Sequence, residues 1–546
     1  MLMAFPAALS VCLSFFLVAF GQPAWSDSFS LMAAAVGYAL FWYGALQFPR
    51  GHFWLGMVWF GAVQAVHLSW LTSTEYMGPL ILAVYVFLLV AIGIQFGLLT
   101  RLVQLPLRVP QILGIAGFWV LMEWIRIFPC TGFTWSSVGL SLAANPFSIQ
   151  FASLFGIYGL SFWVIVTNLL ALRAILVRNK QTAAVWAVCA LLPYAFGAGH
   201  QWIWEQKLGP GKELSVALVQ TALLPEQKEF VWSKEFIPPA IQWDRILSYL
   251  GSEDLSQVDL IVLPEGAVPG GVRRCCYRYE VVQAIWESHF GAGASVDFPP
   301  LVSPYAEKGP RGNWEVSNAF WLQSLANRFG AEVIAGLEDA EPHARYNAAF
   351  HIQPRKSEID RYEKRVLVPI GEYVPLRRWK ILSQWIDRQF EIHDSFDAGL
   401  KAHVFQGVIP IGIAICMEEA YSHLVREIRL AGAELFVSIS NDAWFPSSRL
   451  ARQHYDHGRI RANENGVCLL RACNTGVTAA IDCFGKPIEQ LPISDQIGGV
   501  LSLKMPIRSY PTLYLFWGDL AILLLSGFFL VFCLFHRKKE EKVALI

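Results

Sequence analysis

The segment Ile411-Gly412-Ile413-Ala414-Ile415-Cys416-Met417-Glu418-Glu419 places a cysteine where an apolar strand gives way to a helix. The run from Val408 to Cys416 is short, continuous and rich in isoleucine, as in strands that are buried on both faces. The residues after Met417 turn polar and begin a helix-like segment. Layered α/β folds display functional groups at strand ends and in the loops that follow them. Cys416 is therefore a candidate nucleophile.

Residues 201–511 repeat this alternation of short apolar strands and longer mixed helices. Further runs rich in Val, Ile and Phe lie at 214–220, 259–264, 332–336, 346–352, 434–440, 467–472 and 477–483. Helix-like segments lie at 317–329, 418–431 and 448–465. The alternation predicts an α/β sandwich or layered sheet with a core of its own. Between Gly266 and Asn318 the chain is rich in Gly, Pro, Arg and Cys, and we expect a long loop or an inserted lobe there.

The whole chain is too apolar for an ordinary soluble protein. Of its 546 residues, 54% are hydrophobic and only 16% are charged, whereas soluble domains have about a quarter charged. The 21 Trp and 37 Phe suit positions that face a bilayer or its interface. The formal net charge is zero, which argues against a nucleic-acid partner. The composition therefore predicts a membrane protein that carries an α/β domain.

Seven apolar runs precede the α/β region and an eighth follows it: 4–20, 29–48, 52–71, 79–100, 110–127, 148–172, 183–200 and 512–535. Most have the length of roughly 17–25 residues that a helix needs to cross the hydrocarbon core. No basic residue precedes the first run and six more follow, so we expect a retained helix rather than a cleaved signal peptide. The predicted domains are a transmembrane helical domain with seven spans at 1–200, the α/β domain at 201–511, and a last span with a basic tail at 512–546.

Lysine and arginine in the short loops predict the orientation of these spans. The basic residues fall in every second loop: Arg50, Arg101, Arg108, Arg173, Arg178 and Lys180. The loops between them contain neither lysine nor arginine. Because cytoplasmic loops are enriched in these residues, we expect both termini in the cytoplasm and residues 201–511 outside it.

The ten cysteines do not form a metal motif. No pair has Cys-x-x-Cys spacing and no histidine lies at a matching interval, so neither a metal site nor a cofactor is predicted. Their scatter also differs from a disulfide framework. A bridge among Cys468, Cys473 and Cys483 stays open at this point.

Two further segments carry side chains that suit a cysteine nucleophile. Glu265 follows the strand at 259–264, and Lys364 lies further along the chain. A thiol attacks as the thiolate, and a helix N-terminus or a lysine ammonium stabilises that anion. A carboxylate within hydrogen-bond reach can take the proton. Lys364 and the backbone N–H of Met417 are suitable donors to the oxyanion of a tetrahedral intermediate.

In this order the segments resemble the nitrilase, or carbon–nitrogen hydrolase, superfamily. The segments that match are Pro264-Glu265, Lys364 with Pro369-Ile370-Gly371-Glu372, Ile415-Cys416-Met417-Glu418, Ser440-Asn441-Asp442-Ala443-Trp444-Phe445 and Arg471-Ala472-Cys473-Asn474-Thr475-Gly476. The resemblance implies an αββα sandwich with a Glu–Lys–Cys triad, here Glu265, Lys364 and Cys416.

The apolar runs narrow the resemblance to the membrane-bound branch of the superfamily that acylates bacterial lipoproteins. The membrane half carries the similar segments Glu123–Arg126, Thr131–Trp135 and Phe155–Ser161. The resemblance implies an enzyme of the bacterial inner membrane in which Cys416 attacks a phospholipid, with phosphatidylethanolamine as the expected donor. The α-amine of a diacylglyceryl-cysteine at the N-terminus of an apolipoprotein would then take the acyl chain from the thioester.

The resemblance also implies supporting roles. Glu372 would orient Lys364 or the incoming amine, and Glu418 and Met417 would support the nucleophile. Asn441, Trp444 and Trp232 are candidates for contact with substrate, although both tryptophans could equally be interfacial anchors. Two positions depart from the family: Met417 stands where Tyr is common, and Gly266 stands where Thr or Ser is usual. These departures bear on substrate preference more than on the reaction class.

Two other functions remain open from the residues. A membrane-bound amidase or hydrolase would use the same triad with water as the acceptor, but it has no need of so large a membrane half. A transporter or receptor with an inactive nitrilase-like domain is the second alternative. A transporter needs a path for an ion or solute through its spans. The predicted spans contain few ionisable residues, which gives such a path little support.

Overall fold

The computed structural model describes residues 7–228, 233–376, 379–390 and 395–544. The chain divides into two compact units. One is mainly helical and comprises Met1–Lys207, Arg459–Gly466 and Tyr510–Ile546, and the other comprises Leu208–Gly458 and Val467–Ser509. The short segment Arg459–Gly466 belongs to the helical unit although it lies within the α/β region of the sequence.

The second unit is built on two six-stranded sheets. The first has the strand order β15-β1-β2-β6-β7-β8, with strands at Lys212–Gln220 (β1), Leu260–Val262 (β2), Glu332–Glu341 (β6), Ala344–Ile352 (β7), Ile359–Glu363 (β8) and Gly499–Ile507 (β15). The central strands β1, β2 and β6 are parallel, and the others pair antiparallel. The carboxyl ends of the parallel strands therefore meet at one edge of the sheet.

The second sheet has the same plan. Its order is β14-β13-β12-β11-β10-β9, with strands at Val404–Phe405 (β9), Ile411–Ile415 (β10), Leu435–Ser440 (β11), Cys468–Cys473 (β12), Ala479–Ile481 (β13) and Pro487–Gln490 (β14). The strands β10, β11 and β12 are parallel, so the residues after β10 and β11 leave the same edge. Every strand predicted from an apolar run is present, with shifted ends.

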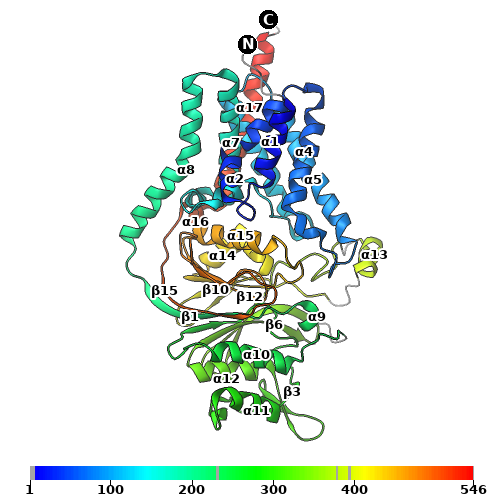
Figure 1. Cartoon of the computed structure of the whole chain (residues 1–546), viewed down its shortest axis with the longest axis vertical. Helices are drawn as coiled ribbons and strands as arrows, with labels where there is room; N and C mark the ends of the chain where they lie inside the picture. The colour runs from blue at the N-terminus through cyan, green and yellow to red at the C-terminus, as the bar shows by residue number, and fades with distance from the viewer. Residues whose placement is uncertain (1–6, 229–232, 377–378, 391–394, 545–546) are drawn as a thin grey trace. The chain divides into compact units, whose positions relative to one another are not determined.

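Helices cover the outer faces of both sheets (Figure 1). The covering helices are α10 (Pro239–Gly251) and α12 (Asn318–Phe329) on the first sheet, and α14 (Ser422–Leu430) and α15 (Leu450–Asn465) on the second. The indole rings of Trp243 in α10 and Trp321 in α12 stack with their centroids 5.4 Å apart, and both side chains are fully buried. The predicted αββα sandwich is confirmed.

One segment differs from its prediction in detail, and the structure decides between two alternatives for another. The helix expected at 418–431 is split into a 3-10 turn, Cys416–Ala420, and α14, because the backbone at Tyr421 is extended. The stretch between Gly266 and Asn318, predicted as a long loop or an inserted lobe, is a lobe. It contains a three-stranded sheet and a helix: β3 (Tyr277–Arg278), β4 (Ala306–Lys308), β5 (Trp314–Val316) and α11 (Tyr279–Phe290).

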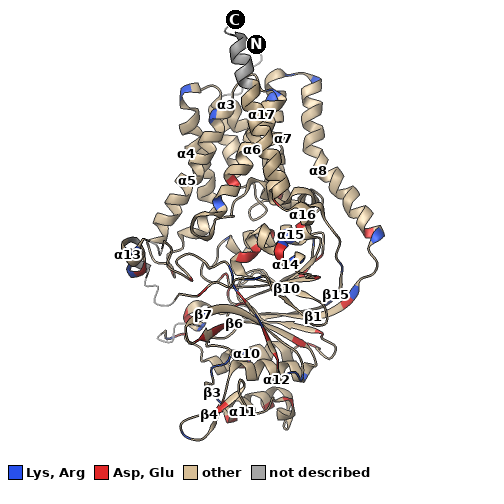
Figure 2. Ribbon diagram, turned by 180° about the vertical axis from the view of Figure 1, so that it is seen from behind, with Lys and Arg blue, Asp and Glu red and all other residues tan. Residues whose placement is uncertain are grey.

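The other unit consists of helices. Their bounds are Ala7–Ala19 (α1), Asp27–Met32 (α2), Tyr38–Ala45 (α3), His52–His67 (α4), Ile81–Leu102 (α5), Val109–Trp124 (α6), Ala152–Val177 (α7), Lys180–Lys207 (α8), Leu513–Trp517 (α16) and Leu520–Ala544 (α17). Figure 2 shows long stretches of α4, α5 and α8 without charged residues. Within the described part of the chain, 4 helical segments are long and apolar enough to cross a membrane: Asp27–Ala45, Ile81–Leu102, Ser148–Val177 and Lys180–Lys207. The count of eight spans stays a prediction.

Small residues let the apolar helices approach closely. A Cβ added to Gly93 of α5 would lie 2.6 Å from the carbonyl oxygen of Met57 in α4, and one added to Gly97 would lie 2.8 Å from that of Phe53. This Gly-x-x-x-Gly spacing is typical of helices that pack without the hydrophobic drive that water provides. The apolar composition of this unit and its packing chemistry are those of a membrane protein.

Candidate active site

Cys416 occupies a backbone conformation that side chains rarely adopt. It follows β10 directly, at φ +52, in the left-handed region. Such a conformation costs on the order of 1–3 kcal/mol for a residue other than glycine, and it persists only where surrounding contacts enforce it. Strained residues of this kind are frequent at active sites, which agrees with the prediction that Cys416 is the nucleophile.

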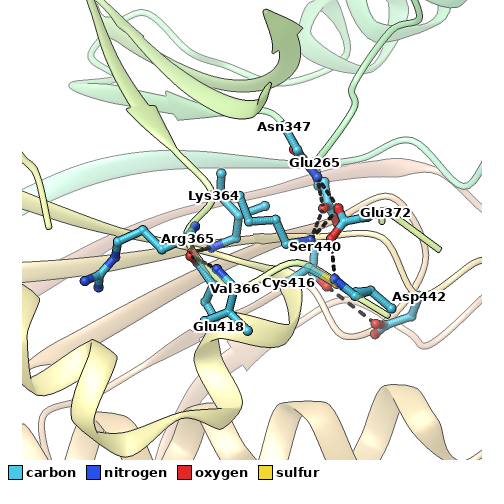
Figure 3. A network of polar contacts seen from close by, with 12 residues as sticks. Glu265, Asn347, Lys364, Arg365, Val366, Glu372, Cys416, Glu418, Ser440 and Asp442 are labelled. Carbon is cyan, nitrogen blue, oxygen red and sulfur yellow. Dashed lines mark hydrogen bonds and ion pairs between the residues drawn. The ribbon is translucent and has the colours of Figure 1, made fainter. Parts of the chain in front are cut away.

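Lys364 joins two carboxylates at this edge of the sandwich. It follows β8, and its side chain is 1% exposed. Its Nζ lies 3.0 Å from Oε1 of Glu265 and 2.8 Å from Oε1 of Glu372. Figure 3 shows these side chains beside Cys416. The structure thus brings together the predicted triad and the predicted second glutamate.

Asn347 completes the cluster and was not predicted from the sequence. Its side chain extends from β7, and its Nδ2 donates to Oε1 of Glu265 at 2.7 Å and to Oε1 of Glu372 at 2.8 Å. Oε1 of Glu265 and Oε1 of Glu372 therefore each accept from both Asn347 and Lys364. The signal available in the sequence was weak: one amide beside Tyr346, in the half of β7 that is only partly buried.

The backbone around Glu265 explains how it reaches this position. The turn that carries it is hydrogen-bonded to β6, since the N–H of Ala267 donates to the carbonyl of Gly336 at 2.8 Å. A Cβ on Gly336 would lie 2.6 Å from the Cα of Glu265. Glycine in the middle of a strand is unfavourable unless another backbone approaches closely. At Gly336 the backbone of the Glu265 turn approaches closely, and any side chain there would collide with it.

Glu372 and Lys364 are anchored by their own loop. The second carboxylate oxygen of Glu372, Oε2, accepts from the N–H of Val368 at 2.7 Å. The N–H of Lys364 donates to the carbonyl of Asn347 at 2.9 Å, which ties the end of β8 to β7. The ammonium therefore has little freedom to leave the two carboxylates.

Glu418 has a different role from the cluster that Lys364 holds. It is 1% exposed, and it accepts hydrogen bonds from Tyr362 Oη at 2.9 Å and from the N–H groups of Arg365 at 2.6 Å and Ile415 at 2.8 Å. Burial raises the pKa of Glu418, and the backbone donors oppose that rise. Its carboxylate ties the segment that carries Lys364 to the strand that ends at Cys416 (Figure 3).

The electrostatics of the cluster favour a neutral thiol and a charged lysine. Burial raises the pKa of the Cys416 thiol well above its usual value, Glu265 raises it further, and Lys364 only partly opposes this. Burial alone would lower the pKa of Lys364, but Glu265 and Glu372 outweigh it and raise that pKa well above its usual value. Lys364 stabilises the thiolate as expected, but burial and the two carboxylates together outweigh that stabilisation.

The remaining predicted residues lie around the site with less distinct roles. Met417 is buried. The side-chain oxygen of Asn441 accepts from Asn474 Nδ2 at 2.8 Å and from the N–H of Ala443 at 3.2 Å, so it shapes its own loop. Trp444 is partly buried. Trp232 lies outside the described residues.

The three cysteines that could have formed a bridge are not disulfide-bonded, although the thiols of Cys468 and Cys483 lie within hydrogen-bonding distance of each other. Cys468, Cys473 and Cys483 are all buried free thiols. Among the described histidine, cysteine, aspartate and glutamate side chains, no group could hold a metal ion.

An αββα sandwich with a buried Glu–Lys–Cys cluster, on a chain that also forms apolar membrane helices, defines a membrane-bound enzyme of the carbon–nitrogen hydrolase class. The family model "Carbon-nitrogen hydrolase" matches residues 216–499, and the model "Apolipoprotein N-acyltransferase N-terminal domain" matches residues 14–170. The chain belongs to the apolipoprotein N-acyltransferase family, and it is an acyltransferase.

Relatives with that name match nearly the whole chain. The apolipoprotein N-acyltransferase of Chlamydia caviae is 33% identical over 95% of this chain and 95% of its own. That of Chlamydia pneumoniae is 31% identical over 94% of each chain. That of Haemophilus ducreyi is 26% identical over 90% of this chain and 87% of its own. Among solved structures, a carbon–nitrogen hydrolase from Helicobacter pylori matches with 14% identity and a TM-score of 0.33, over 55% of this chain and 90% of its own.

Alkylation of Cys416 tests the charge balance of the site. Since the Glu265 and Glu372 carboxylates raise the pKa of the thiol, Glu265→Gln or Glu372→Gln should shift the pH midpoint of alkylation by iodoacetamide downward. Lys364→Met should shift it upward, because the ammonium opposes the rise. Peptide mass mapping after timed alkylation gives the midpoint for Cys416 alone. Glu358→Gln, at an exposed position, is the matched control. An unchanged or raised midpoint in Glu265→Gln would refute this balance.

Replacement of Asn347 tests the amide that spans the two carboxylates. Asn347→Ala removes a donor from both Glu265 and Glu372, and we expect acyl-transfer kcat to fall about tenfold or more, since a lost buried hydrogen bond is worth on the order of 1–3 kcal/mol. The KM for lipid should change little. Asn313→Ala, at an exposed loop position, should behave as wild type. Activity of Asn347→Ala within twofold of wild type would mean that the amide is dispensable.

Proposed function

We propose that this chain transfers an acyl chain from a phospholipid to the N-terminal α-amine of diacylglyceryl-cysteine in apolipoproteins, through a thioester on Cys416. This reaction is the final step of bacterial lipoprotein maturation. The observation that carries the mechanism is the cluster of Lys364 between Glu265 and Glu372, beside a strained cysteine. Family membership and the apolar helices support a lipid as the acyl donor.

The first half-reaction begins with a neutral thiol. Glu265 takes the proton of Cys416 as the sulfur attacks the ester carbonyl carbon of the phospholipid, because the raised thiol pKa disfavours a free thiolate. The tetrahedral intermediate bears an oxyanion, for which Lys364 Nζ and the backbone N–H of Met417 are the proposed donors. The intermediate collapses to the thioester, and the departing lysophospholipid oxygen receives the proton held by Glu265.

The second half-reaction uses the same groups in the opposite direction. The α-amine of the diacylglyceryl-cysteine attacks the thioester carbonyl, and Glu265 takes the proton that the amine loses. The carbon–sulfur bond then breaks, and Cys416 regains its proton. Glu372 keeps Lys364 charged and oriented throughout, since it shares the ammonium with Glu265. Glu418 holds the segment that carries Lys364 close to the end of β10, where Cys416 lies.

The finer assignments are part of the same proposal. Phosphatidylethanolamine is the proposed donor, the other partners being diacylglyceryl-apolipoproteins and the surrounding membrane lipids. Residues 1–200 and 512–546 form the spans in the inner membrane, and residues 201–511 form the catalytic domain on the periplasmic side, with both termini in the cytoplasm. The alternation of basic and non-basic loops supports this orientation. Trp232, Trp444 and Asn441 remain candidates for substrate contact.

A transfer assay separates this function from lipid hydrolysis. Purified protein is mixed with phosphatidylethanolamine bearing labelled acyl chains, with and without a synthetic diacylglyceryl-cysteinyl peptide. We expect labelled N-acyl peptide from the complete mixture, slow fatty-acid release without the peptide, and no product from Cys416→Ala. Cys276→Ala, at an exposed cysteine, is the control and should retain activity.

The hydrolase alternative makes the opposite prediction in that assay. Fatty acid would appear at the same rate with or without the peptide, and no N-acyl peptide would form. Repeating the reaction with phosphatidylglycerol and phosphatidylcholine ranks the donors, and a clear preference for either would overturn the choice of phosphatidylethanolamine while leaving the transfer reaction intact.

A further inference from the structure

A histidine contacts the backbone of the candidate nucleophile from the side of α15. His454 is 1% exposed, and its Nε2 lies 3.0 Å from the carbonyl oxygen of Cys416. Its other ring nitrogen, Nδ1, lies 2.9 Å from Oδ1 of Asp442. Figure 3 shows Asp442 and Ser440 close to Cys416. None of these three residues has a part in the two half-reactions above.

The contacts of His454 define its protonation state. A peptide carbonyl and a carboxylate both accept hydrogen bonds, and a neutral imidazole carries a hydrogen on only one of its nitrogens. Both nitrogens of His454 face such acceptors, so satisfying both contacts requires the doubly protonated imidazolium. Nε2 also lies 3.4 Å from Oε2 of Glu419, a third acceptor. The hydroxyl of Ser440, 3.5 Å from Nδ1, is itself placed to donate to Asp442.

The charged groups around His454 are two carboxylates and one other cation, so their charges cancel when His454 itself is protonated. Asp442 and Glu419 supply two carboxylates, and Arg471 supplies a second cation whose Nη1 lies 2.5 Å from Glu419 Oε2. Burial alone would lower the pKa of His454, but Asp442 and Glu419 outweigh burial and Arg471, so that pKa is raised from its usual value. A buried charge is tolerated where it is paired in this way.

Two glycines make room for this set. A Cβ on Gly458 would lie 2.1 Å from Oε1 of Glu419, and one on Gly476 would lie 2.6 Å from Oδ2 of Asp442. Gly458 lies inside α15, where glycine destabilises a helix by roughly 0.5–1 kcal/mol relative to alanine. Its presence there is explained by the space that the Glu419 carboxylate occupies.

We infer that His454, held as an imidazolium by Asp442 and Glu419, is a positioning residue that fixes the left-handed backbone of Cys416. A hydrogen bond from a cation is roughly twice as strong as one between neutral groups, which suits it to oppose the strain at φ +52. With the carbonyl of Cys416 held by His454, the thiol is kept beside Glu265 and Lys364. The inference rests on the proposed role of Cys416 as the nucleophile.

The inference predicts an effect on turnover and on its pH dependence. Deprotonation of His454 removes one of its two hydrogens, so one of its contacts is lost and acylation should slow on the alkaline side. His454→Gln can still donate to the Cys416 carbonyl but cannot titrate, whereas His454→Leu can do neither. We expect His454→Gln to acylate within about tenfold of wild type without the alkaline limb, and His454→Leu to lose about a hundredfold or more.

Single-turnover thioester formation from labelled phosphatidylethanolamine, measured across pH on the full-length protein, tests this. The KM for lipid should stay within twofold in every variant, and His343→Gln, at an exposed histidine, should match wild type. Asp442→Asn, which removes the carboxylate partner, should shift the alkaline limb to lower pH. Thermal unfolding of each variant identifies misfolding, and if His454→Leu does not fold, His454→Gln and Asp442→Asn decide.

The outcomes separate this inference from the proposed function. No thioester in the wild type would refute the proposed function itself. A wild-type thioester together with a normal alkaline limb in His454→Gln, or with full activity in a folded His454→Leu, would overturn the role of His454 and leave the function standing.

Discussion

The ammonium of Lys364, shared between Glu265 and Glu372, is the interaction on which the rest of the site depends. A lysine buried this far from water is stable as a cation only with carboxylates beside it. Without the ammonium, the two carboxylates would repel each other. Glu265 follows β2, whereas Lys364 and Glu372 both lie in the segment after β8, so the cluster can form only when β2 and β8 end at the same edge of the first sheet. Asn347 then closes the arrangement by donating to both carboxylates. The strand order of the first sheet therefore determines whether these three charged groups can meet.

The same charge balance constrains the chemistry. Burial and the two carboxylates raise the pKa of the Cys416 thiol against one ammonium, which favours the protonated thiol at rest, the form less prone to oxidation and alkylation. In the proposed mechanism, proton transfer to Glu265 therefore accompanies attack on the lipid ester. In this mechanism the thiol becomes reactive only when a carbonyl is bound beside it. This suits an enzyme that is proposed to bind two bulky lipids one after the other.

The sequence predicted the parts of this structure that depend on local pattern. The apolar strands and the three catalytic candidates follow from short contiguous segments and Glu372 from the family resemblance, and the structure brings Glu265, Lys364, Glu372 and Cys416 together. The features that the sequence did not predict depend on contacts between distant segments. Asn347 looks like an ordinary strand residue until β7 is placed beside the Glu265 turn, and His454 looks like part of a polar helix until α15 covers β11 and the residues after it. The break at Tyr421 likewise has no periodic signal, and composition alone could not decide between a loop and a lobe after Gly266.

Intact-protein mass spectrometry tests the central claim most directly. Wild type, Glu265→Gln and Cys416→Ala are each incubated with phosphatidylethanolamine in the absence of any amine acceptor. The account predicts a mass increase of one acyl chain on the wild type, its removal by hydroxylamine, its absence from Cys416→Ala, and its much slower appearance in Glu265→Gln. An adduct that forms on Cys416→Ala, or one that resists hydroxylamine, would show that the acyl chain does not pass through a thioester on Cys416.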